Sequence, residues 1–368
     1  MNPSQCGIRL TISILGAFLV QPVVYAATYY IDPDSDVAGR GWGTEARPYK
    51  QWGDVTIRSG NEYLQKSGTV SRGGISIKGV RNVFIGAYGE GPQPQLDGRK
   101  MVDNGIKLVA TQNVAISGFT LRRYRGSCIH IVGSANYLIE NNTCEQAKYG
   151  ISVNAGEFGP RGRIIGNEIR DTTSDGIGAW NLNPGPIILD NHVHRFGNDG
   201  IDVLGSTNAV IAENNVHESF DIIGKGSRGT THAGIKAGGN RGKGGGNNYV
   251  IGNTVRAVKN YGIYNRAAVG NVYIDNLCEG NGVNFNFVNP EGPSFAYIAG
   301  NISRNPSYVA GLEYGVFIPN ADALSYADGN HWYDGVINVQ GLGRISDQDD
   351  YRGKMYPNES GTVISPQE

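Results

Sequence analysis

The chain has 368 residues, a formal net charge of −1 at pH 7 and 55 glycines. This length allows a large core, and the near-zero net charge excludes a general attraction to nucleic acid or to an anionic membrane surface. Proline is not enriched, so the glycines indicate neither a collagen-like nor a simply disordered chain. Glycine together with frequent asparagine favours many tight turns with positive φ.

Residues 1–26 have the organisation of a secretory signal peptide. Arg9 supplies the positive charge, an apolar run extends from Leu10 to Val20, and Ala26 is the small residue expected at a cleavage site. A membrane anchor is the alternative interpretation, but the apolar run is short for a span. We therefore expect a secreted or periplasmic protein that works as a monomer.

Export would remove Cys6 and leave three cysteines without metal-ligand spacing, Cys128, Cys144 and Cys278. Two of them occupy positions where other repeats have Ile or Val. We expect small buried hydrophobic residues rather than disulfides.

After a short predicted strand at 28–31 and a brief predicted helix within 48–55, two repeats dominate the chain. A Gly-Ile pair recurs, and Cys128-Ile129 replaces it once; its glycines are Gly74, Gly105, Gly150, Gly176, Gly200, Gly234 and Gly262. A second series of asparagines follows, mostly 23 to 25 residues apart: Asn142, Asn167, Asn191, Asn214, Asn253, Asn276 and Asn301.

Each repeat contains two or three short runs of alternating apolar and polar residues, which is the period of a β-strand. A unit of this size cannot bury its apolar face alone, so the units must stack. We predict an all-β, right-handed, single-strand parallel β-helix at 27–320 and a C-terminal capping tail at 321–368. A leucine-rich repeat lacks its Leu signature here, and a β-propeller needs longer periods.

In this register the isoleucines of the Gly-Ile pairs form an inward column. The asparagines form a turn ladder in which Asn tolerates left-handed geometry and the side-chain amides bond along the stack. The interval from Gly200 to Gly234 is about ten residues longer than the others. We expect this insertion, which carries Lys225 and Arg228, and a Gly-rich one after Gly238 to flank a binding surface.

An outward strip follows the Gly-Ile strand. The residues directly after the pairs are Lys107, His130, Ser152, Gly178, Asp202, Lys236 and Tyr264, and two positions further are Asn154, Trp180, Leu204, Gly238 and Arg266. Asp175 and Asp199 precede their glycines and should stack in the same way, with rungs roughly 5 Å apart. Carboxylates, a lysine and aromatic rings suit an acidic sugar, whereas the alternative is a solvated ladder with an exposed ion pair of little energetic value.

The motifs Asn198-Asp199-Gly200-Ile201-Asp202 and Gly234-Ile235-Lys236, with Asp175 one coil earlier, resemble polysaccharide lyase family 9, the calcium-dependent pectate lyases. The segment 86–98 also resembles early coils of such enzymes. The resemblance implies that Asp175, Asn198, Asp199 and Asp202 bind Ca²⁺ and that Lys236 is the Brønsted base. In this chain Asn198 replaces an aspartate, and Ile201 and Ile235 replace aromatic residues.

The implied reaction is β-elimination on an acidic polysaccharide, with a cation on the uronate carboxylate and a neutral lysine that removes the adjacent proton. We expect substrate contacts from Arg266, Tyr264, Trp180, His232 and Arg228, and His232 is also an alternative base. His192 and His194 have the spacing of a ligand pair but lie beside the asparagine ladder, so a metal role for them is not favoured. The competing functions are a glycoside hydrolase with paired carboxylates, a uronate epimerase and a non-catalytic carbohydrate-binding protein.

Overall fold

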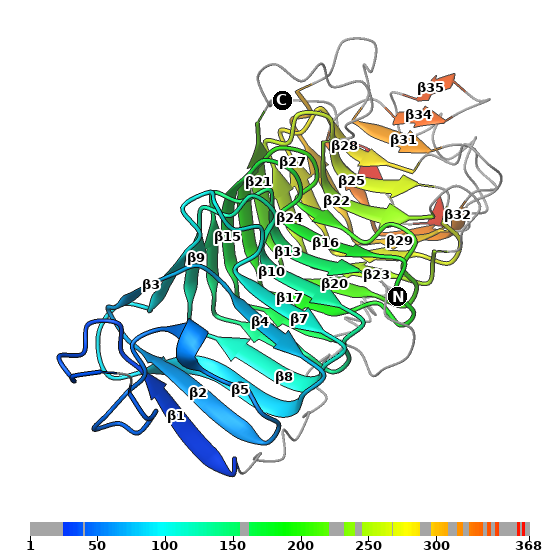
Figure 1. Ribbon diagram of the computed structural model, residues 1–368. Helices are drawn as coiled ribbons and strands as arrows, with labels where there is room; N and C mark the ends of the chain where they lie inside the picture. The colour runs from blue at the N-terminus through cyan, green and yellow to red at the C-terminus, as the bar shows by residue number, and fades with distance from the viewer. Residues whose placement is uncertain are drawn as a thin grey trace, which may run out of the picture.

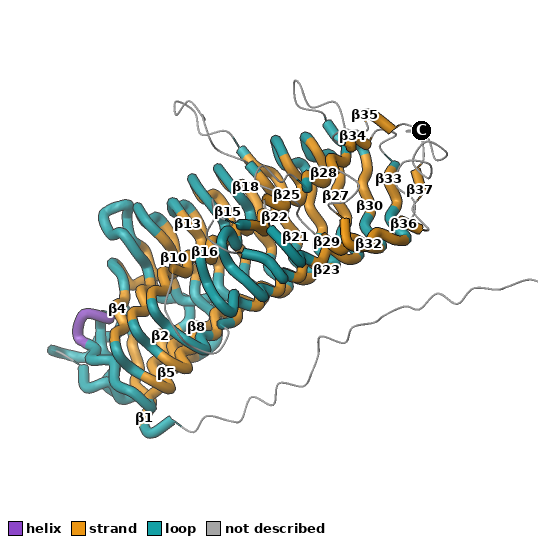
Figure 2. Tube along the Cα trace, turned by 90° about the vertical axis from the view of Figure 1, so that its right-hand side faces the viewer, coloured by secondary structure: helices purple, strands orange, loops and turns teal. Residues whose placement is uncertain are grey.

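The computed structural model describes residues 25–39, 41–154, 162–220, 232–239, 245–266, 268–287, 296–307, 315–318, 324–333, 337–339, 343–345, 359–360 and 363–364. Over these residues the chain winds as a parallel β-helix whose coils add one strand to each of three sheets in turn. Figure 2 shows the stacked coils as one elongated body, from β1 at one end to β36 and β37 at the other. The predicted fold class is confirmed.

Sheet 1 has 13 strands. In order they are β1 (Ala27–Ile31), β2 (Asn61–Lys66), β5 (Arg81–Tyr88), β8 (Gln112–Ser117), β11 (Leu138–Glu140), β14 (Arg163–Ile165), β17 (Ile187–Leu189), β20 (Val210–Ala212), β23 (Tyr249–Ile251), β26 (Val272–Ile274), β29 (Ala296–Ala299), β32 (Leu324–Asp328) and β36 (Glu359–Ser360).

Sheet 2 has 12 strands. They are β3 (Val70–Arg72), β6 (Gln95–Asp97), β9 (Thr120–Arg122), β12 (Thr143–Glu145), β15 (Glu168–Thr172), β18 (His192–Phe196), β21 (Asn215–Ser219), β24 (Thr254–Arg256), β27 (Leu277–Glu279), β30 (Ile302–Arg304), β33 (His331–Trp332) and β37 (Val363–Ile364).

Sheet 3 also has 12 strands, which lie side by side in Figure 1. They are β4 (Ile75–Lys78), β7 (Ile106–Val109), β10 (Ser127–Val132), β13 (Tyr149–Asn154), β16 (Ile177–Trp180), β19 (Ile201–Asp202), β22 (Ala233–Gly238), β25 (Tyr261–Arg266), β28 (Val283–Asn286), β31 (Val316–Ile318), β34 (Ile337–Val339) and β35 (Gly343–Ile345).

The Gly-Ile repeat sets the register of sheet 3. Ile177 pairs with Ile201, and Ile201 pairs with Ile235. The whole predicted column is fully buried: Ile106, Ile129, Ile151, Ile177, Ile201, Ile235 and Ile263. A glycine precedes each of these isoleucines except Ile129, which follows Cys128. Where the chain turns from sheet 2 into sheet 3, a Cβ on Gly200 would lie 2.4 Å from Val216 Cγ1 and 2.6 Å from the carbonyl oxygen of Gly234.

The asparagine ladder runs along the turn between sheets 1 and 2. Asn191 Nδ2 donates to Asn214 Oδ1 at 3.0 Å, and Asn214 Nδ2 donates to Asn253 Oδ1 at 2.9 Å. The predicted amide stacking is therefore confirmed, even across the long coil. The predicted left-handed geometry is wrong by one position: positive φ belongs to the residue before each ladder asparagine, namely Asn141, Gly166, Asp190, Glu213, Gly252, Asp275 and Gly300.

Smaller predictions can also be compared with the structure. A short 3-10 helix, η1 (Trp52–Asp54), lies within the expected segment, and Cys128, Cys144 and Cys278 are buried free thiols, as predicted. After residue 320 the strands β32, β33 and β34 still extend the three sheets in parallel, and β35 pairs with β34 antiparallel. No helix in the part of the chain described above is long and apolar enough to cross a membrane.

Candidate active site

The predicted outward strip forms on sheet 3. Asp202 on β19 pairs with Gly178 on one side and with Lys236 on the other, and Lys236 pairs with Tyr264. The second row also forms, since Trp180 pairs with Asn154 and Arg266 pairs with Gly238. Asp175, Asn198 and Asp199 lie just before sheet 3, where each coil leaves sheet 2. The repeat therefore brings the acidic residues and the lysine together.

These charged groups are buried. Asp199 is 0% exposed, and Asp175, Asp202 and Lys236 are exposed by only 3%, 4% and 6%. The alternative of a solvated ladder with an exposed ion pair is wrong, because removing charged groups from water has a large cost that close partners must offset.

Lys236 lies between two carboxylates. Its Nζ donates to Asp199 Oδ2 at 2.9 Å and lies 3.6 Å from Asp202 Oδ2. Asp199 Oδ1 also accepts the backbone N–H of Ala233 at 2.9 Å. The ammonium thus occupies the space between Asp199 and Asp202, where charge compensation is needed most.

Asp175 joins the cluster through Asn198. Asn198 Nδ2 donates to Asp175 Oδ1 at 2.7 Å and to Asp199 Oδ2 at 3.2 Å, and the Asp199 N–H reaches Asp175 Oδ1 at 3.2 Å. Asn198 Oδ1 is buried and accepts no hydrogen bond from the part of the chain that the structure describes. An amide oxygen of this kind beside three carboxylates is a ready ligand for a hard cation.

Trp180 connects Asp202 to the rest of the outward face. Its Nε1 donates to Asp202 Oδ2 at 3.0 Å, while the Leu204 N–H donates to Asp202 Oδ1 at 2.9 Å. The indole lies over Gly178, where an added Cβ would be 2.0 Å from Trp180 Cζ2. Gly178 therefore leaves the room that the ring requires to reach Asp202.

The electrostatics of the cluster reflect burial and excess negative charge. Burial and the neighbouring Asp199 and Asp202 charges raise the pKa of Asp175 well above its ordinary value. Burial raises the pKa of Asp202 to about 6, although Lys236 opposes this rise. Burial lowers the pKa of Lys236, but Asp199 and Asp202 outweigh it and the net pKa is raised, so the amine is charged at neutral pH.

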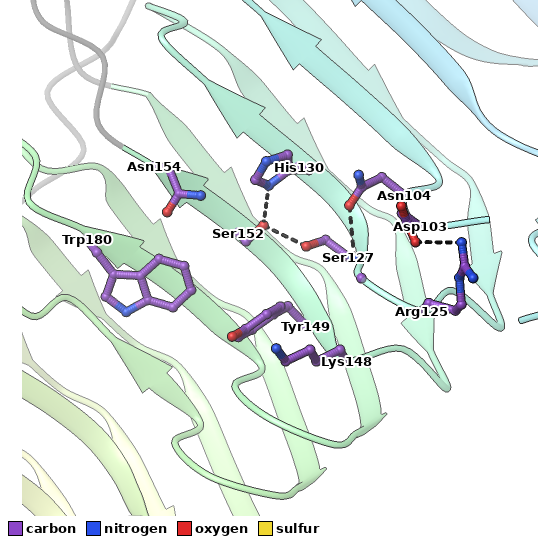
Figure 3. Close-up of a pocket in the computed structure, with 11 residues that line it drawn as sticks. Asp103, Asn104, Arg125, Ser127, His130, Lys148, Tyr149, Ser152, Asn154 and Trp180 are labelled. Atoms are coloured by element: carbon purple, nitrogen blue, oxygen red, sulfur yellow. Dashed lines mark hydrogen bonds and ion pairs between the residues drawn. The ribbon is translucent and has the colours of Figure 1, made fainter. Parts of the chain in front are cut away.

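A cavity of about 470 Å³ lies on sheet 3 on the N-terminal side of the cluster, with Trp180 at its border. Figure 3 shows Tyr149 beside Trp180, and the two rings meet edge-on with centroids 5.6 Å apart. Lys148 Nζ lies 5.0 Å from the centre of the Tyr149 ring. Polar side chains complete the wall, with Ser127, His130, Ser152 and Arg125 among them.

Sequence reasoning missed most of this cavity, although a signal was present. Asn104, Ser127 and Tyr149 precede the first residue of a Gly-Ile pair or its Cys-Ile equivalent, as Asp175 and Asp199 do. Ser127 pairs with Tyr149 across β10 and β13. The cavity wall thus continues the column of residues before each glycine, of which Asp175 and Asp199 are the acidic members.

The other predicted site residues have different positions. Tyr264 is 8% exposed, beside Lys236, and its ring stacks on Tyr261 with centroids 4.9 Å apart. Arg266 is half-buried at the end of β25, and His232 is buried just before β22. Arg228 lies outside the described residues.

The chain matches the family model described as "Right handed beta helix region" over residues 104–278. No curated protein aligns with it at a significant level.

Solved structures share the fold at low identity. Pectate lyase Pel9A superposes with a TM-score of 0.60 at 14% identity, over 78% of this chain and 78% of that one. The A-module of mannuronan C-5 epimerase AlgE6 from Azotobacter vinelandii gives 0.57 at 16% identity, over 93% and 89%. The GH136 lacto-N-biosidase from Eubacterium ramulus gives 0.58 at 13% identity, over 92% and 68%. The protein has the fold of a right-handed parallel β-helix.

Proposed function

We propose that the protein is an exported polysaccharide lyase that cleaves a uronate-containing polymer by β-elimination, as family 9 lyases do. One observation carries the proposal: Lys236 is buried against Asp199 and Asp202 at the end of a face lined by aromatic rings. A base and carboxylates on a wall that can hold sugar rings are the parts that proton abstraction from a uronate requires.

Asp175, Asn198, Asp199 and Asp202 are the residues that we propose hold Ca²⁺. Their donors are all oxygen atoms, they carry excess negative charge, and Asn198 Oδ1 lacks a hydrogen bond, so the donor set fits a hard cation. When bound, the ion would neutralise the uronate carboxylate and so make its neighbouring proton more acidic.

Lys236 is the proposed base, and its present charge explains why the cation matters. A lysine can accept a proton only when neutral, yet Asp199 and Asp202 hold its pKa high. Once the charges of these carboxylates are compensated, burial is left as the main influence, and burial favours the neutral amine. Charge compensation at Asp199 and Asp202 would thus change Lys236 from an ion-pair partner into a base.

The substrate is proposed to lie along sheet 3. Tyr264 and Arg266 flank Lys236 on one side, and Trp180 flanks Asp202 on the other and borders the cavity with Tyr149. The cavity would hold sugar units next to the scissile bond, with Lys148 and Arg125 near their carboxylates. Two similar structures carry the names pectate lyase and mannuronan epimerase, which refer to uronate polymers and support this substrate class.

The test is a panel of polyuronates and acidic exopolysaccharides, each incubated with the protein in Ca²⁺ or in chelator. The expected result is ultraviolet absorbance from a conjugated double bond, in Ca²⁺ only, because only elimination creates that bond. New reducing ends without absorbance would instead support a glycoside hydrolase. Inverted uronate without chain cleavage would support an epimerase, and binding without any product a carbohydrate-binding protein.

Export is part of the proposal and has a separate test. The segment 1–26 should be removed on secretion, so the mature protein should begin near Ala27 and migrate as a monomer. N-terminal sequencing of the exported protein and its mass in solution would check both statements.

A further inference from the structure

Half of the histidines in the chain meet on the outer face of sheet 2, away from the candidate active site. The chain has six histidines, and three of them lie on β18 and β21. Glu168 on β15 pairs with His192, and His194 pairs with His217. Three neighbouring coils therefore contribute side chains to one cluster, defined here as Glu168, His192, His194 and His217.

The polar atoms of this cluster face one another at short range. Glu168 Oε2 lies 2.7 Å from His192 Nδ1, and Glu168 Oε1 lies 2.6 Å from His194 Nε2. His192 Nε2 and His217 Nε2 are 2.7 Å apart. The ring centroids of His192 and His194 are 4.5 Å apart, so the cluster is a compact stack rather than a row of solvated side chains.

The ligand atoms converge as a metal site requires. One atom each from Glu168, His192 and His194 lie within 4.8 Å of one another, and a second such group shares His194 with His217 and Glu218. Within the described residues, Asp175, Asp199 and Asp202 do not make a group this close. We propose that Glu168, His192 and His194, with His217 beside them, bind a divalent transition-metal ion such as Zn²⁺.

The chemistry of the donors decides the kind of ion. Imidazole nitrogen and carboxylate oxygen are the usual protein ligands of Zn²⁺, whereas Ca²⁺ takes oxygen ligands. The donors of this site thus differ in chemistry from the all-oxygen donors of Asp175, Asp199 and Asp202. The His192 side chain is 40% exposed and the Glu168 side chain 31%, so an ion can enter and retain a water ligand.

The two neighbouring arginines form ion pairs with carboxylates outside the cluster. Arg170 pairs with Glu145 at 2.6 Å, and Arg256 pairs with Glu279 at 3.1 Å. These arginines lie in the same outward row as His194 and His217, yet each has its own carboxylate. A bound ion would link β15, β18 and β21, and β18 leads directly into the turn that carries Asn198 and Asp199.

The sequence disfavoured this site because only His192 and His194 are visible as a pair. Glu168 and His217 are 24 and 25 residues from His192, one coil away on each side. The repeat brings them together, but only an exact register of sheet 2 shows that Glu168 lies in the row of His192 and His217 in the row of His194.

The test uses the full chain without a polyhistidine tag, stripped with chelator and titrated with Zn²⁺ in a calorimeter and with Co²⁺ in a spectrophotometer. We expect one tightly bound ion, visible absorption bands for Co²⁺ with nitrogen ligands, and a raised Tm. Excess Ca²⁺ should not displace the ion.

His194→Ala and Glu168→Gln should each weaken Zn²⁺ binding at least about tenfold. His331→Ala is the matched control, since His331 also lies on an outward row of sheet 2, and it should bind as the parent does. His192→Ala provides a second variant at a more exposed position. The proposal is overturned if the parent binds no Zn²⁺, or if His194→Ala and His192→Ala bind it as tightly as His331→Ala does.

Discussion

Lys236 is subject to two opposing influences, and its role depends on which of them prevails. Burial favours the neutral amine, while Asp199 and Asp202 favour the ammonium. Register analysis predicted that Lys236 and Asp202 are neighbours, because Gly-Ile pairs set the same offset in each coil. The register did not predict that Lys236 is buried or that it contacts Asp199 directly. Both depend on how side chains of other rows pack over the outward residues of sheet 3.

Lys236→Arg separates a base from an anchor. Arginine keeps the charge but does not deprotonate near neutral pH. The variant should fold and bind polymer, yet its rate of unsaturated product formation should fall by at least about a hundredfold. Lys66→Arg is the control, because Lys66 is half-exposed and pairs with Asp32 at 2.9 Å, far from the candidate active site. A variant that retains most of its rate would exclude Lys236 as the base and favour His232 or Tyr264.

Trp180→Phe tests the hydrogen bond to Asp202. The substitution keeps an aromatic ring beside Tyr149 but removes the N–H that stabilises the ionised carboxylate. The pKa of Asp202 should therefore rise above its present value of about 6. The acidic limb of the pH–rate profile should move to higher pH. Trp42→Phe, at a Trp that is 68% exposed, should leave the profile unchanged, and an unchanged profile in both variants would remove Asp202 from the reaction.

At the scale of the element, the asparagine ladder is the clearest link from sequence to structure. Asn214 Nδ2 donates to the carbonyl oxygens of Ile188 and Ala212 at 3.0 and 2.9 Å, besides its bond to Asn253. Its Oδ1 accepts from both the N–H and the Nδ2 of Asn191. The amide thus satisfies backbone groups of two coils at a buried turn and bonds to the side chain of Asn253 in a third.

Asn214→Ala should be strongly destabilising. Several buried groups lose their partners together, each at a cost of about 1–3 kcal/mol. We expect at least about 3 kcal/mol of lost stability, measured as a lower denaturant midpoint. Asn215→Ala, at the exposed neighbouring position, is the control and should have little effect. Equal midpoints for the two variants would contradict the role of the ladder.

The residue before each ladder asparagine has left-handed geometry, one position earlier than the asparagine at which the sequence predicts it. The residues at this earlier position are of mixed type, with Gly166 and Gly252 but also Asp190 and Glu213, so a pattern of residue types does not report their positive φ. Glu213 has φ 56 where the equivalent residue of the next coil is Gly252. A side chain with a Cβ is strained in this conformation.

Glu213→Gly should therefore stabilise the protein by about 1 kcal/mol, visible as a higher Tm. The same change at Glu140, the last residue of β11, should lower the Tm, because glycine in a strand has a conformational cost. A lower Tm for Glu213→Gly would show that its contacts outweigh the strain.

The stacked coils of the β-helix place each repeated position of the sequence in a continuous row on one of the three sheets. The cavity, Trp180, the carboxylates and Lys236 lie in order along sheet 3, while the histidine cluster lies on sheet 2 of the same coils. The period and the outward rows could be predicted from the sequence. The depth of burial could not, because it depends on the long side chains that cover each row.

The buried carboxylates should set the response of the whole fold to pH and to Ca²⁺. The pKa values of Asp175 and Asp202 are raised by burial, so their protonated forms favour the folded state. This stabilisation is complete below the ordinary pKa of 3.8 and is lost as the pH rises through about 6 for Asp202. Lys236, whose pKa is also raised, remains charged throughout this range and does not change the sign.

In chelator, the contribution of Asp175 and Asp202 to the Tm should therefore fall between pH 5 and pH 8. Ca²⁺ needs ionised ligands, so it should raise the Tm at pH 8 and have little effect at pH 5. Asp175→Asn removes one titrating group and should reduce both effects, whereas Asp190→Asn, at an exposed position, should reduce neither. If Ca²⁺ shifts the Tm of the parent equally at both pH values, or shifts that of Asp175→Asn as much as that of the parent, the carboxylates of sheet 3 are not the site at which the ion acts.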